Sequence, residues 1–367
     1  MKIKALQTME EFQRYVNFGQ EVYKHDLYWV APDSNQEVSL LSGAAPIGSH
    51  ARIQPFWVED GERLLGTVTA VIDDTFNAHW KQTIGHLVSF EALSEQPDAA
   101  QSLIDSACGW LRERDCTAAR MSFLYGWQLP FTIDSYQSVP TIFHTYNPAY
   151  YHSYIKNSGF ATENGQAEYQ VSFTPELASR YRQMVQRIST AGITLRVWDF
   201  AKLEEESASF RDIYNETFAS HWGAPQFTQA EMEGLTIGLK DLLVPDFTAF
   251  AEVDGKTAGG VFSMPDLNQA FHRMQGKIIE ENFPEFLQAL QGIDHGVLLT
   301  IGVRPEFRGQ GVNLALAAKS YLAMIERGYK TASYTTVLDE NWPSRRTAEK
   351  LGARIARNFI VYRKELV

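Results

Sequence analysis

The sequence predicts a mixed α/β fold that is built twice along one chain of 367 residues. Two hairpin signals, Asp60-Gly61 and Asp254-Gly255, each separate a pair of strand-like runs. The residue numbers of their glycines differ by 194, and those of Asn147 and Asn341 differ by 194 as well. Sequence features that recur at a constant spacing along the chain indicate two copies of one domain. We therefore expect two tandem domains, each a mixed, twisted sheet flanked by helices.

The same order of elements is expected in each half, because alternating apolar residues predict strands and apolar residues at helical spacing predict helices. For the first half we expect a strand at 2–6, a helix at 9–23, the hairpin around Gly61, a strand at 83–90, a helix at 98–114 and a closing strand at 168–173. For the second half we expect a strand at 194–197, helices at 204–218 and 229–243, the hairpin around Gly255, a strand at 296–303, a helix at 312–327 and a closing strand at 358–364.

Composition narrows the class of protein. The chain is 44% hydrophobic and 13% aromatic, which suffices for two cores, and its net charge of −11 argues against nucleic acid as a partner. The two cysteines, Cys108 and Cys116, form neither a CxxC motif nor a disulfide framework. We recognise no signal peptide and no apolar run of ~18 residues. These observations predict a cytoplasmic protein with no membrane partner and no metal.

One turn carries most of the chemical information. The apolar strand at 296–303 is followed by Arg308, Gly309 and Gly311, and then by an apolar helix that stops at Gly328. Glycines let backbone N–H groups point into a turn, and a helix N-terminus adds a partial positive charge, so such a turn can bind phosphate. An ordinary strand–helix connection is the alternative. The turn fits neither a Walker loop nor the dinucleotide pattern G-x-G-x-x-G.

The turn resembles the pyrophosphate loop of the GNAT N-acetyltransferases, R/Q-x-x-G-x-G/A, as Arg308-Gly-Gln-Gly311-Val-Asn313. Asn313 stands where the family has a small residue. A second segment, Asn341 to Gly352-Ala353, resembles the family's N-x-x-A-x-x-L-Y-x-x-x-G-F, with Ser344 at the small position. Its Gly352 and Gly159 of the first half differ by 193 in number. Ala348 stands where many relatives carry a tyrosine that protonates the leaving thiolate.

The resemblance implies a two-copy bacterial GNAT protein that uses acetyl-CoA or another acyl-CoA as co-substrate. The segments Pro265-Asp-x-Asn-Gln269 and Tyr28-Trp-Val-x-Pro32 are similar to those of such tandem proteins. The residues implied to bind the coenzyme are Ile301, Val303, Arg308, Gly309, Gln310, Gly311, Val312, Asn313, Asn341 and Ser344.

The first half lacks this turn. Its counterpart, 90–98, carries Glu91, Glu95 and Asp98, and carboxylates repel a diphosphate. We therefore expect residues 1–175 to form a degenerate domain without a phosphate loop, 176–191 to form a connecting helix, and 192–367 to form the coenzyme-binding domain.

Candidates for acyl transfer come from the second half and from two insertions. His295 could act as base or could be a capped residue, and Tyr334 could act as acid or could be a core aromatic. Backbone N–H groups at 300–303 would stabilise the oxyanion. In the insertion 264–294, Asp266, Asn268 and Gln269 could bind substrate or could cap a helix. In the insertion 124–146, the aromatic residues Tyr125, Trp127 and Tyr136 could line an acceptor pocket.

Two functions follow from these observations. The first is an N-acyltransferase that moves an acyl group, by default acetyl, directly from acyl-CoA to an amine of a small molecule or peptide. The second is a non-catalytic acyl-CoA-binding or regulatory protein. A third, narrower idea is the transfer of a longer acyl chain.

Overall fold

A computed structural model describes residues 1–121, 131–274 and 280–366. Tyr125 and Trp127 lie outside the described residues. The chain forms two compact units, and neither is continuous in sequence. Unit 1 comprises Met1–Gly165 and Phe359–Val367, and unit 2 comprises Gln166–Arg273 and Ile278–Asn358.

Unit 1 contains a mixed sheet with the strand order β1-β2-β3-β4-β5-β13, and β6 also pairs with β13. Only β4 and β5 run parallel among these pairs. Its strands are β1 (Lys2–Ala5), β2 (Ala51–Asp60), β3 (Arg63–Asp73), β4 (Ile84–Ala92), β5 (Ala118–Met121), β6 (Phe131–Thr132) and β13 (Arg354–Glu365). Its helices are α1 (Met9–Asn17), α2 (Gly19–Val22), α3 (Ser34–Leu41), α4 (Asp74–Trp80), α5 (Pro97–Arg112) and α6 (Tyr151–Asn157).

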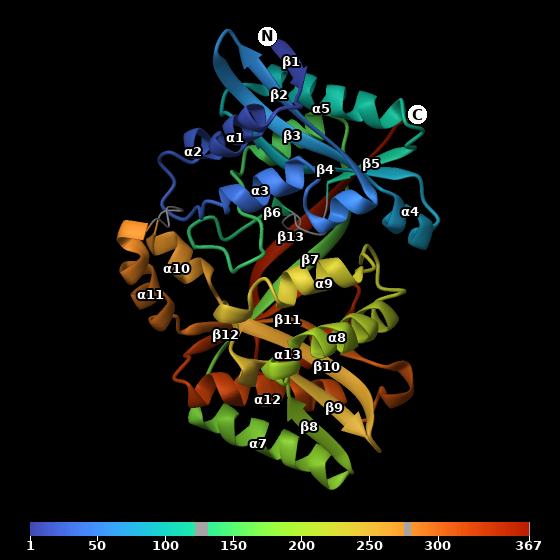
Figure 1. The fold of residues 1–367 in the computed structure, drawn as a ribbon, viewed down its shortest axis with the longest axis vertical. Coiled ribbons are helices and arrows are strands. Elements are labelled where there is room, and N and C mark those ends of the chain that lie inside the picture. Colours follow the sequence, from blue (N-terminus) through green and yellow to red (C-terminus); the bar gives the residue numbers. More distant parts are fainter. Residues whose placement is uncertain (122–130, 275–279, 367) are drawn as a thin grey trace. The chain divides into compact units, whose positions relative to one another are not determined.

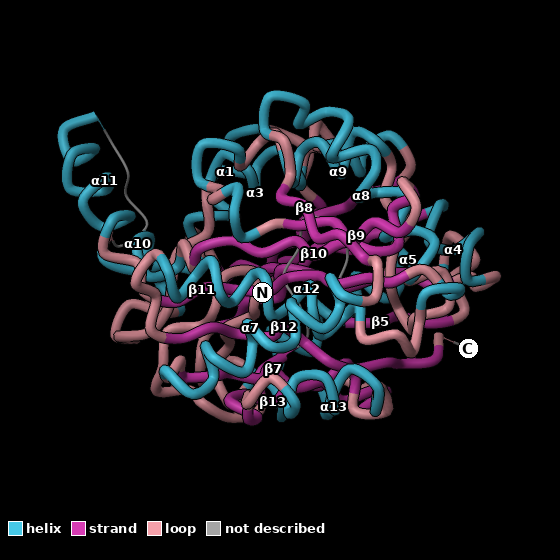
Figure 2. Tube along the Cα trace, turned by 90° about the horizontal axis from the view of Figure 1, so that it is seen from below, coloured by secondary structure: helices cyan, strands magenta, loops and turns pink. Residues whose placement is uncertain are grey.

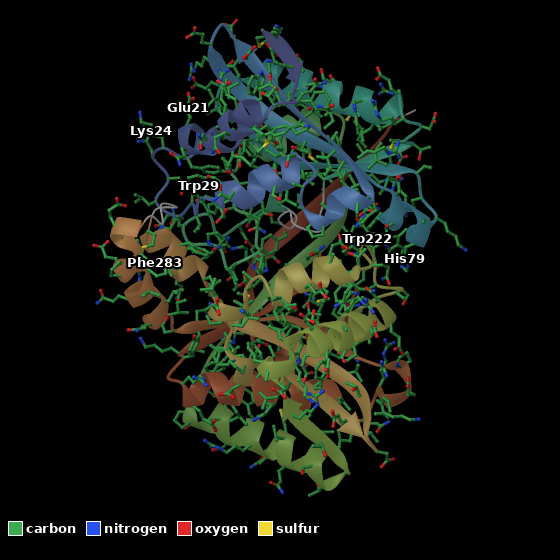
Figure 3. The ribbon with its side chains drawn as sticks, in the orientation of Figure 1. Glu21, Lys24, Trp29, His79, Trp222 and Phe283 are labelled. Atoms are coloured by element: carbon green, nitrogen blue, oxygen red, sulfur yellow. The ribbon has the colours of Figure 1, made fainter. Side chains whose placement is uncertain are left out.

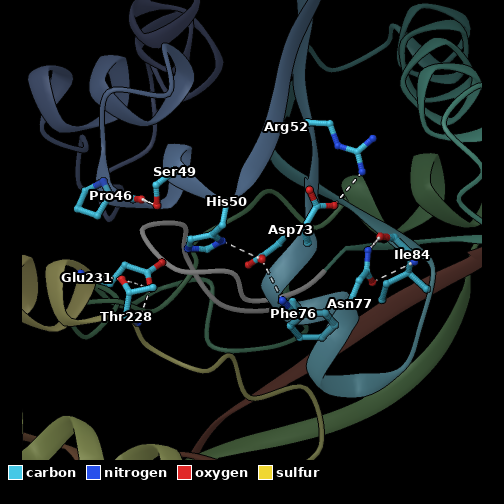
Figure 4. A network of polar contacts seen from close by, with 11 residues as sticks. Pro46, Ser49, His50, Arg52, Asp73, Phe76, Asn77, Ile84, Thr228 and Glu231 are labelled. Atoms are coloured by element: carbon cyan, nitrogen blue, oxygen red, sulfur yellow. Dashed lines mark hydrogen bonds and ion pairs between the residues drawn. The ribbon is translucent and has the colours of Figure 1, made fainter.

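Local contacts explain why elements of unit 1 begin and end where they do. Helix α1 starts with a capping box between Thr8 and Glu11, which satisfies two backbone N–H groups. The β2–β3 hairpin turns at Gly61, whose φ of +59° suits glycine. Helix α4 is capped by Asp73, which accepts a hydrogen bond from the Phe76 N–H (2.9 Å) and lies 3.0 Å from His50 Nδ1 (Figure 4).

Unit 2 repeats this plan with the strand order β7-β12-β11-β10-β9-β8, and only β11 and β12 run parallel. Its strands are β7 (Ala161–Ser172), β8 (Ile193–Val197), β9 (Ala249–Val253), β10 (Lys256–Pro265), β11 (His295–Val303) and β12 (Thr331–Leu338). Its helices are α7 (Pro175–Thr190), α8 (Leu203–Thr217), α9 (Gln229–Thr236), α10 (Asn268–Arg273), α11 (Phe283–Gln291), α12 (Val312–Glu326) and α13 (Trp342–Lys350).

Helix α12 is the centre of the unit 2 core. Ten of its side chains are buried, and it lies beside α7 (Figure 1), where the rings of Tyr181 and Tyr321 are 5.7 Å apart. A Cβ atom on Gly296 would lie 2.4 Å from Met324 Sδ, so this glycine allows α12 to approach β11 closely. The predicted connecting helix thus packs into unit 2 as α7.

The prediction for the two closing strands was wrong. The strand expected to close the first half, β7, pairs with β12 of unit 2, where Tyr169 lies opposite Tyr334. The strand expected to close the second half, β13, pairs with β5 of unit 1, where Tyr362 lies opposite Met121. Each unit therefore borrows its last strand from the other half of the chain. The predicted linear boundaries at 175 and 192 do not follow these compact units.

The insertion between β10 and β11 contains α10 and α11, which lie beside one another (Figure 2) with the rings of Phe271 and Phe286 stacked 5.9 Å apart. In the described part of the chain, no helix is both long and apolar enough to cross a membrane. Over the same residues, no three His, Cys, Asp or Glu side chains gather in a way that could hold a metal ion.

Candidate active site

Strands β11 and β12 separate at one level of the unit 2 sheet. Their parallel ladder begins at His295 and Thr331 and ends at Leu298 and Tyr334. At this level the β10–β11 register shifts, so β11 carries a bulge at Leu299. Residues 295–298 of β11 are buried, whereas 299–301 are half-buried, and Thr335 and Thr336 of β12 become half-buried at the same level. Backbone pairing between the two strands therefore ends at this level, and the unpaired stretch beyond Leu298 and Tyr334 is called the opening below.

A side chain already bridges this opening. The hydroxyl of Thr335 donates a hydrogen bond to the Leu299 carbonyl, at 2.8 Å. The Thr335 side chain thus bonds to a carbonyl of β11 that lies beyond the last backbone pair with β12. The predicted coenzyme contacts Ile301 and Val303 lie further along the same strand, where their side chains pack on the edge of the core. The segment 299–303 is where the predicted oxyanion donors lie.

The glycine turn follows β11 directly, as predicted. Gly309 and Gly311 have φ values of +79° and +81°, in the left-handed region that favours glycine. Gly311 is the N-cap of α12 and gives the helix no side-chain cap. A Cβ atom at either glycine would meet nothing within 4 Å. The space beside both glycines is therefore open, and no side chain caps the first backbone N–H groups of α12, an arrangement that suits an anion.

The side chains of the turn brace it. Arg308 Nε donates to the Val303 carbonyl at 3.1 Å, and its Nη2 lies 3.5 Å from the Thr217 carbonyl at the end of α8. Gln310 Nε2 donates to the Glu306 carbonyl at 3.3 Å. Arg308 thus ties the turn to two neighbouring elements, while its positive charge stays exposed beside the glycines.

The second predicted segment meets the turn through hydrogen bonds. Asn313 Nδ2 donates to the Thr347 hydroxyl at 2.8 Å. Asn313, which stands where the GNAT pattern has a small residue, therefore joins α12 to α13. Asn341 is the N-cap of α13 and accepts from the Ser344 N–H at 3.2 Å. The Ser344 hydroxyl lies 3.0 Å from the hydroxyl of Tyr334. Tyr334 ends the β11–β12 ladder, so the opening and the α13 N-terminus adjoin.

The phenol of Tyr334 is protonated at neutral pH, as a general acid must be. Burial raises the pKa of its phenol to about 12, although the hydrogen bond with Ser344 opposes this rise. The hydroxyl therefore carries its proton throughout the neutral range. A phenol at the level where the strands part can donate a hydrogen bond to a sulfur leaving there.

His295 lies at the opposite end of β11 from the turn. Its Nδ1 is 2.7 Å from the Thr331 hydroxyl and its Nε2 is 2.8 Å from the Ser333 hydroxyl. The side chain is only 4% exposed. Because both ring nitrogens contact hydroxyl groups of β12, His295 can reach a substrate only through them.

The predicted substrate residues lie beside His295 and make structural contacts. The Asp266 N–H donates to the His295 carbonyl at 2.9 Å, and Asp266 Oδ1 accepts from the Asn268 N–H at 3.3 Å, at the start of α10. Gln269 exchanges two hydrogen bonds with Asp294, at 3.2 and 3.1 Å. These contacts hold the insertion against the first residue of β11. Substrate binding by the three residues stays a prediction.

The counterpart of the opening in unit 1 is filled by the protein itself. The hydroxyls of Tyr150 and Tyr151 bond to the Ala92 carbonyl and N–H, at 2.7 and 2.8 Å. Ala92 is the last residue of β4, six residues beyond His86, where the β4–β5 ladder ends. Tyr151 also donates to Glu91 at 2.5 Å. In unit 2 the corresponding backbone is the end of β11, near Val303, and α13 contains no tyrosine that could bond to it. Unit 1 thus satisfies internally the groups that a ligand would use.

An open pocket of about 530 Å³ remains outside these tyrosines in unit 1. Its lining includes Glu21 and Lys24, which Figure 3 shows at the edge of the unit, together with Asp26, Leu93 and Ser94. The pocket mixes acids and bases and has no glycine turn. It therefore lacks the anion-binding geometry of the turn after β11.

The filled site in unit 1 predicts a pH dependence of stability. Burial raises the pKa of Glu91 from its ordinary value of 4.5 to about 8. Between these values the folded protein holds a proton that the unfolded chain has released, so the free energy of unfolding falls as the pH rises. Glu91→Gln removes this loss. Its melting temperature relative to the wild type should therefore rise between pH 5 and pH 9.

Thermal unfolding of both proteins at the two pH values checks this expectation. Glu10→Gln, on the exposed face of α1, provides the control and should shift equally at both. An identical offset of Glu91→Gln at pH 5 and pH 9 would show that Glu91 titrates normally.

Comparison with known families supports the resemblance seen in the sequence. Residues 207–353, which include β11, the glycine turn and α13, match the model of the acetyltransferase (GNAT) family. A bacterial ceramide synthase of Caulobacter vibrioides is 23% identical over 375 residues, covering 100% of this chain and 98% of that protein. Protein YghO of Escherichia coli is 19% identical over 377 residues, covering 99% and 95%.

Solved structures share the fold over the whole length of this chain. A tandem GNAT protein from the clavulanic acid biosynthesis pathway superposes with a TM-score of 0.58 at 12% identity, covering 100% of this chain and 98% of that one. A GCN5-related N-acetyltransferase from Sphaerobacter thermophilus gives 0.55 at 12% identity, covering 100% and 95%. At such identities the likeness concerns the fold alone. Residues 207–353 of this chain therefore form a GNAT-type domain, and the chain as a whole has the fold of a tandem GNAT protein.

Proposed function

We propose that this protein transfers an acyl group from acyl-CoA to a primary amine, with the coenzyme bound by unit 2 alone. The observation that carries the proposal is the coincidence, on β11, of the opening beyond Leu298 and the Gly309–Gly311 turn. The turn provides backbone N–H groups for the diphosphate. The freed edge of β11 provides hydrogen-bonding groups for the pantetheine arm and the thioester carbonyl.

Three groups then act on the reacting atoms. The amine nitrogen attacks the thioester carbonyl, and negative charge develops on its oxygen. Backbone N–H groups within 300–303 would stabilise that charge. As the C–S bond breaks, the Tyr334 hydroxyl donates a hydrogen bond to the departing sulfur. Tyr334 thus takes the role of the tyrosine that many relatives have at the position of Ala348. Ser344 keeps the Tyr334 hydroxyl oriented, at 3.0 Å.

A long-chain amine is the acceptor that we favour. The bacterial ceramide synthase aligns over 98% of its own length, so both units have counterparts in it. A ceramide is the amide of a fatty acid with a long-chain amino alcohol, which requires N-acyl transfer of the kind proposed here. The idea of a longer acyl chain, drawn first from the sequence, agrees with this acceptor class.

The experiment is turnover of acyl-CoA by the purified full chain. Acetyl-CoA and palmitoyl-CoA are each offered with long-chain 2-amino-1,3-diols, amino acids and short peptides, and the released thiol and the amide product are measured. We expect amide formation with palmitoyl-CoA and the aminodiol. Tight coenzyme binding without consumption of any acyl-CoA would instead favour the non-catalytic binding protein.

A further inference from the structure

A chain of buried polar side chains crosses three strands of unit 2. The Ser333 hydroxyl on β12 donates to Glu168 Oε1 on β7 at 2.5 Å, and its oxygen lies 2.8 Å from His295 Nε2 on β11. Glu168 is 3% exposed, Ser333 is fully buried, and His295 is 4% exposed. Since Ser333 gives its own proton to Glu168, it accepts the proton of His295 Nε2. The imidazole, hydroxyl and carboxylate thus form one directed chain.

Glu168 lies at the level of the opening between β11 and β12. Tyr169 pairs with Tyr334, the last residue of the β11–β12 ladder, and Glu168 comes next along the strand. There the β7–β12 register shifts, so Thr335 and Thr336 together face Glu168. Bulges of this kind re-aim side chains and occur often beside active sites. The carboxylate is therefore adjacent to the half-buried edge of the opening.

Glu168 also lies on the face of the sheet away from α12. Tyr169 and Tyr334 belong to the core that packs around α12. Side chains alternate between faces along a strand, so Glu168 and Ser333 point to the other face. The glycine turn delivers the coenzyme from the α12 N-terminus. A nucleophile attacks a flat carbonyl perpendicular to its plane, so an acceptor arriving from the other face meets Glu168.

Unit 1 shows what the fold alone requires at these positions. The registers place Val361 where unit 2 has Glu168, because Tyr362 pairs with Met121 as Tyr169 pairs with Tyr334. Likewise, Ile84 begins the parallel ladder of unit 1 as His295 begins that of unit 2. Val361 is fully buried and Ile84 is 1% exposed. The sheet is therefore built equally well with apolar residues at both places.

The comparison between units argues against a purely structural need for the side chains of Glu168 and His295. Burying a carboxyl and an imidazole costs free energy even when both are hydrogen-bonded, and apolar side chains avoid that cost. At the positions of Glu168 and His295 the copy without a glycine turn has apolar residues. At the position of Ser333 it has Arg120, which is 2% exposed and pairs with Glu163 at 2.6 Å. The polar chain thus accompanies the capacity to bind the coenzyme.

From this placement we propose that Glu168 is the general base that takes a proton from the acceptor amine, with Ser333 and His295 as positioning residues. The inference rests on the proposed function. The ammonium group R–NH3+ gives one proton to the carboxylate, and the nitrogen lone pair then forms the N–C bond. The C–S bond breaks with its electron pair on sulfur. The nitrogen releases a second proton, and the sulfur gains one, so that amide and thiol result with one net proton released.

The test compares Glu168→Gln with the wild-type chain, using palmitoyl-CoA and a long-chain 2-amino-1,3-diol. We expect kcat/KM at pH 7 to fall by about 10²- to 10⁴-fold, the range for a lost general base. Without the base only free amine reacts, so log kcat/KM of the variant should rise with a slope of about one from pH 7 to 9, below the ordinary amine pKa of ~10. Glu168→Asp should recover part of the rate.

Binding measurements and a matched control separate catalysis from folding. The Kd of palmitoyl-CoA should stay within about twofold in Glu168→Gln, since the carboxylate lies on the acceptor side. Glu91→Gln alters a buried carboxyl of unit 1 and should keep the wild-type kcat. Groups that influence the profile beyond His295 are Asp294 and Lys330, 2.9 Å apart, where the Lys330 hydrogen bond lowers the pKa of Asp294.

The outcomes are distinct. If Glu168→Gln keeps the wild-type kcat and pH profile, Glu168 is not the base, although the transfer reaction stands. A loss that is equal at every pH and is accompanied by weaker coenzyme binding and a lower melting temperature would assign Glu168 a structural role. A wild-type chain that forms no amide would overturn the proposed function, and the base with it.

Discussion

Replacing Gly311 by valine is expected to raise the Kd of coenzyme A by about 100-fold. Gly311 has a φ of +81°, and this left-handed conformation costs an L-residue roughly 1–2 kcal/mol, more when it is β-branched. Relaxation of the backbone would turn the first N–H groups of α12 away from the diphosphate. Each charge-assisted hydrogen bond lost is worth about 1.5–3 kcal/mol, and ~1.4 kcal/mol is tenfold in affinity.

The fold should survive this change, because a side chain at 311 meets open space. Gly328 offers a matched control at the other end of α12, with a φ of +86° and equally open surroundings. Gly328→Val has comparable strain at the far end of a helix about 22 Å long, at 1.5 Å per residue over 15 residues, and should bind coenzyme A normally. Calorimetric titration of both variants decides. Wild-type affinity in Gly311→Val would mean that the turn only connects β11 and α12.

The second large effect is expected from Tyr334→Phe, which should lower kcat by about 10²-fold, the lower end for a lost general acid. Thiols ionise near pH 8.5, so a departing thiolate gains from a donor that is still protonated. Because the pKa of Tyr334 is about 12, the loss should be the same from pH 6 to pH 9. Coenzyme affinity should not change.

Tyr321→Phe is the matched control for this substitution. Tyr321 belongs to the same core, and among the described residues its buried hydroxyl has no hydrogen-bond partner. Its removal should leave kcat unaltered. Steady-state kinetics with palmitoyl-CoA and the aminodiol measure both variants. An unaltered kcat in Tyr334→Phe would remove the phenol from the mechanism.

Local sequence patterns predicted the elements of the candidate site well. The Gly309–Gly311 turn, the hairpins at Gly61 and Gly255 and helix α12 depend on residues close together in the chain, such as glycines with positive φ. Asn341 was singled out by its offset of 194 from Asn147 and by the resemblance to the GNAT segment, and the structure shows it as the N-cap of α13. Such local patterns can be interpreted from the sequence alone, because they do not depend on tertiary contacts.

The exchange of closing strands could not be predicted in this way. Both β7 and β13 have the alternating pattern of a strand, and neither pattern specifies a distant partner. The choice between β12 and β5 is made by tertiary packing, for example by Tyr169 in the core of unit 2 and Tyr362 in that of unit 1. Assigning each closing strand to its own half of the sequence therefore gave incorrect strand partners.

Glu168 was missed because it lies in a strand that was assigned to the first half. A signal for it existed, since Glu168 and Val361 differ in number by 193, the offset that also relates Gly159 and Gly352. A comparison of the two copies position by position would have singled out a carboxylate opposite a valine. His295 was recognised as a candidate base. In the structure its Nε2 contacts the Ser333 hydroxyl, which in turn donates a hydrogen bond to Glu168.

The most direct test of the central claim, that unit 2 alone binds the coenzyme, is the stoichiometry of coenzyme A binding to the wild-type chain. Unit 1 fills its counterpart site with tyrosine hydroxyls and Glu91, whereas unit 2 keeps an opening and a glycine turn. Isothermal titration should therefore give one site per chain. Two equivalent sites per chain, or one site that persists in Gly311→Val, would contradict the account.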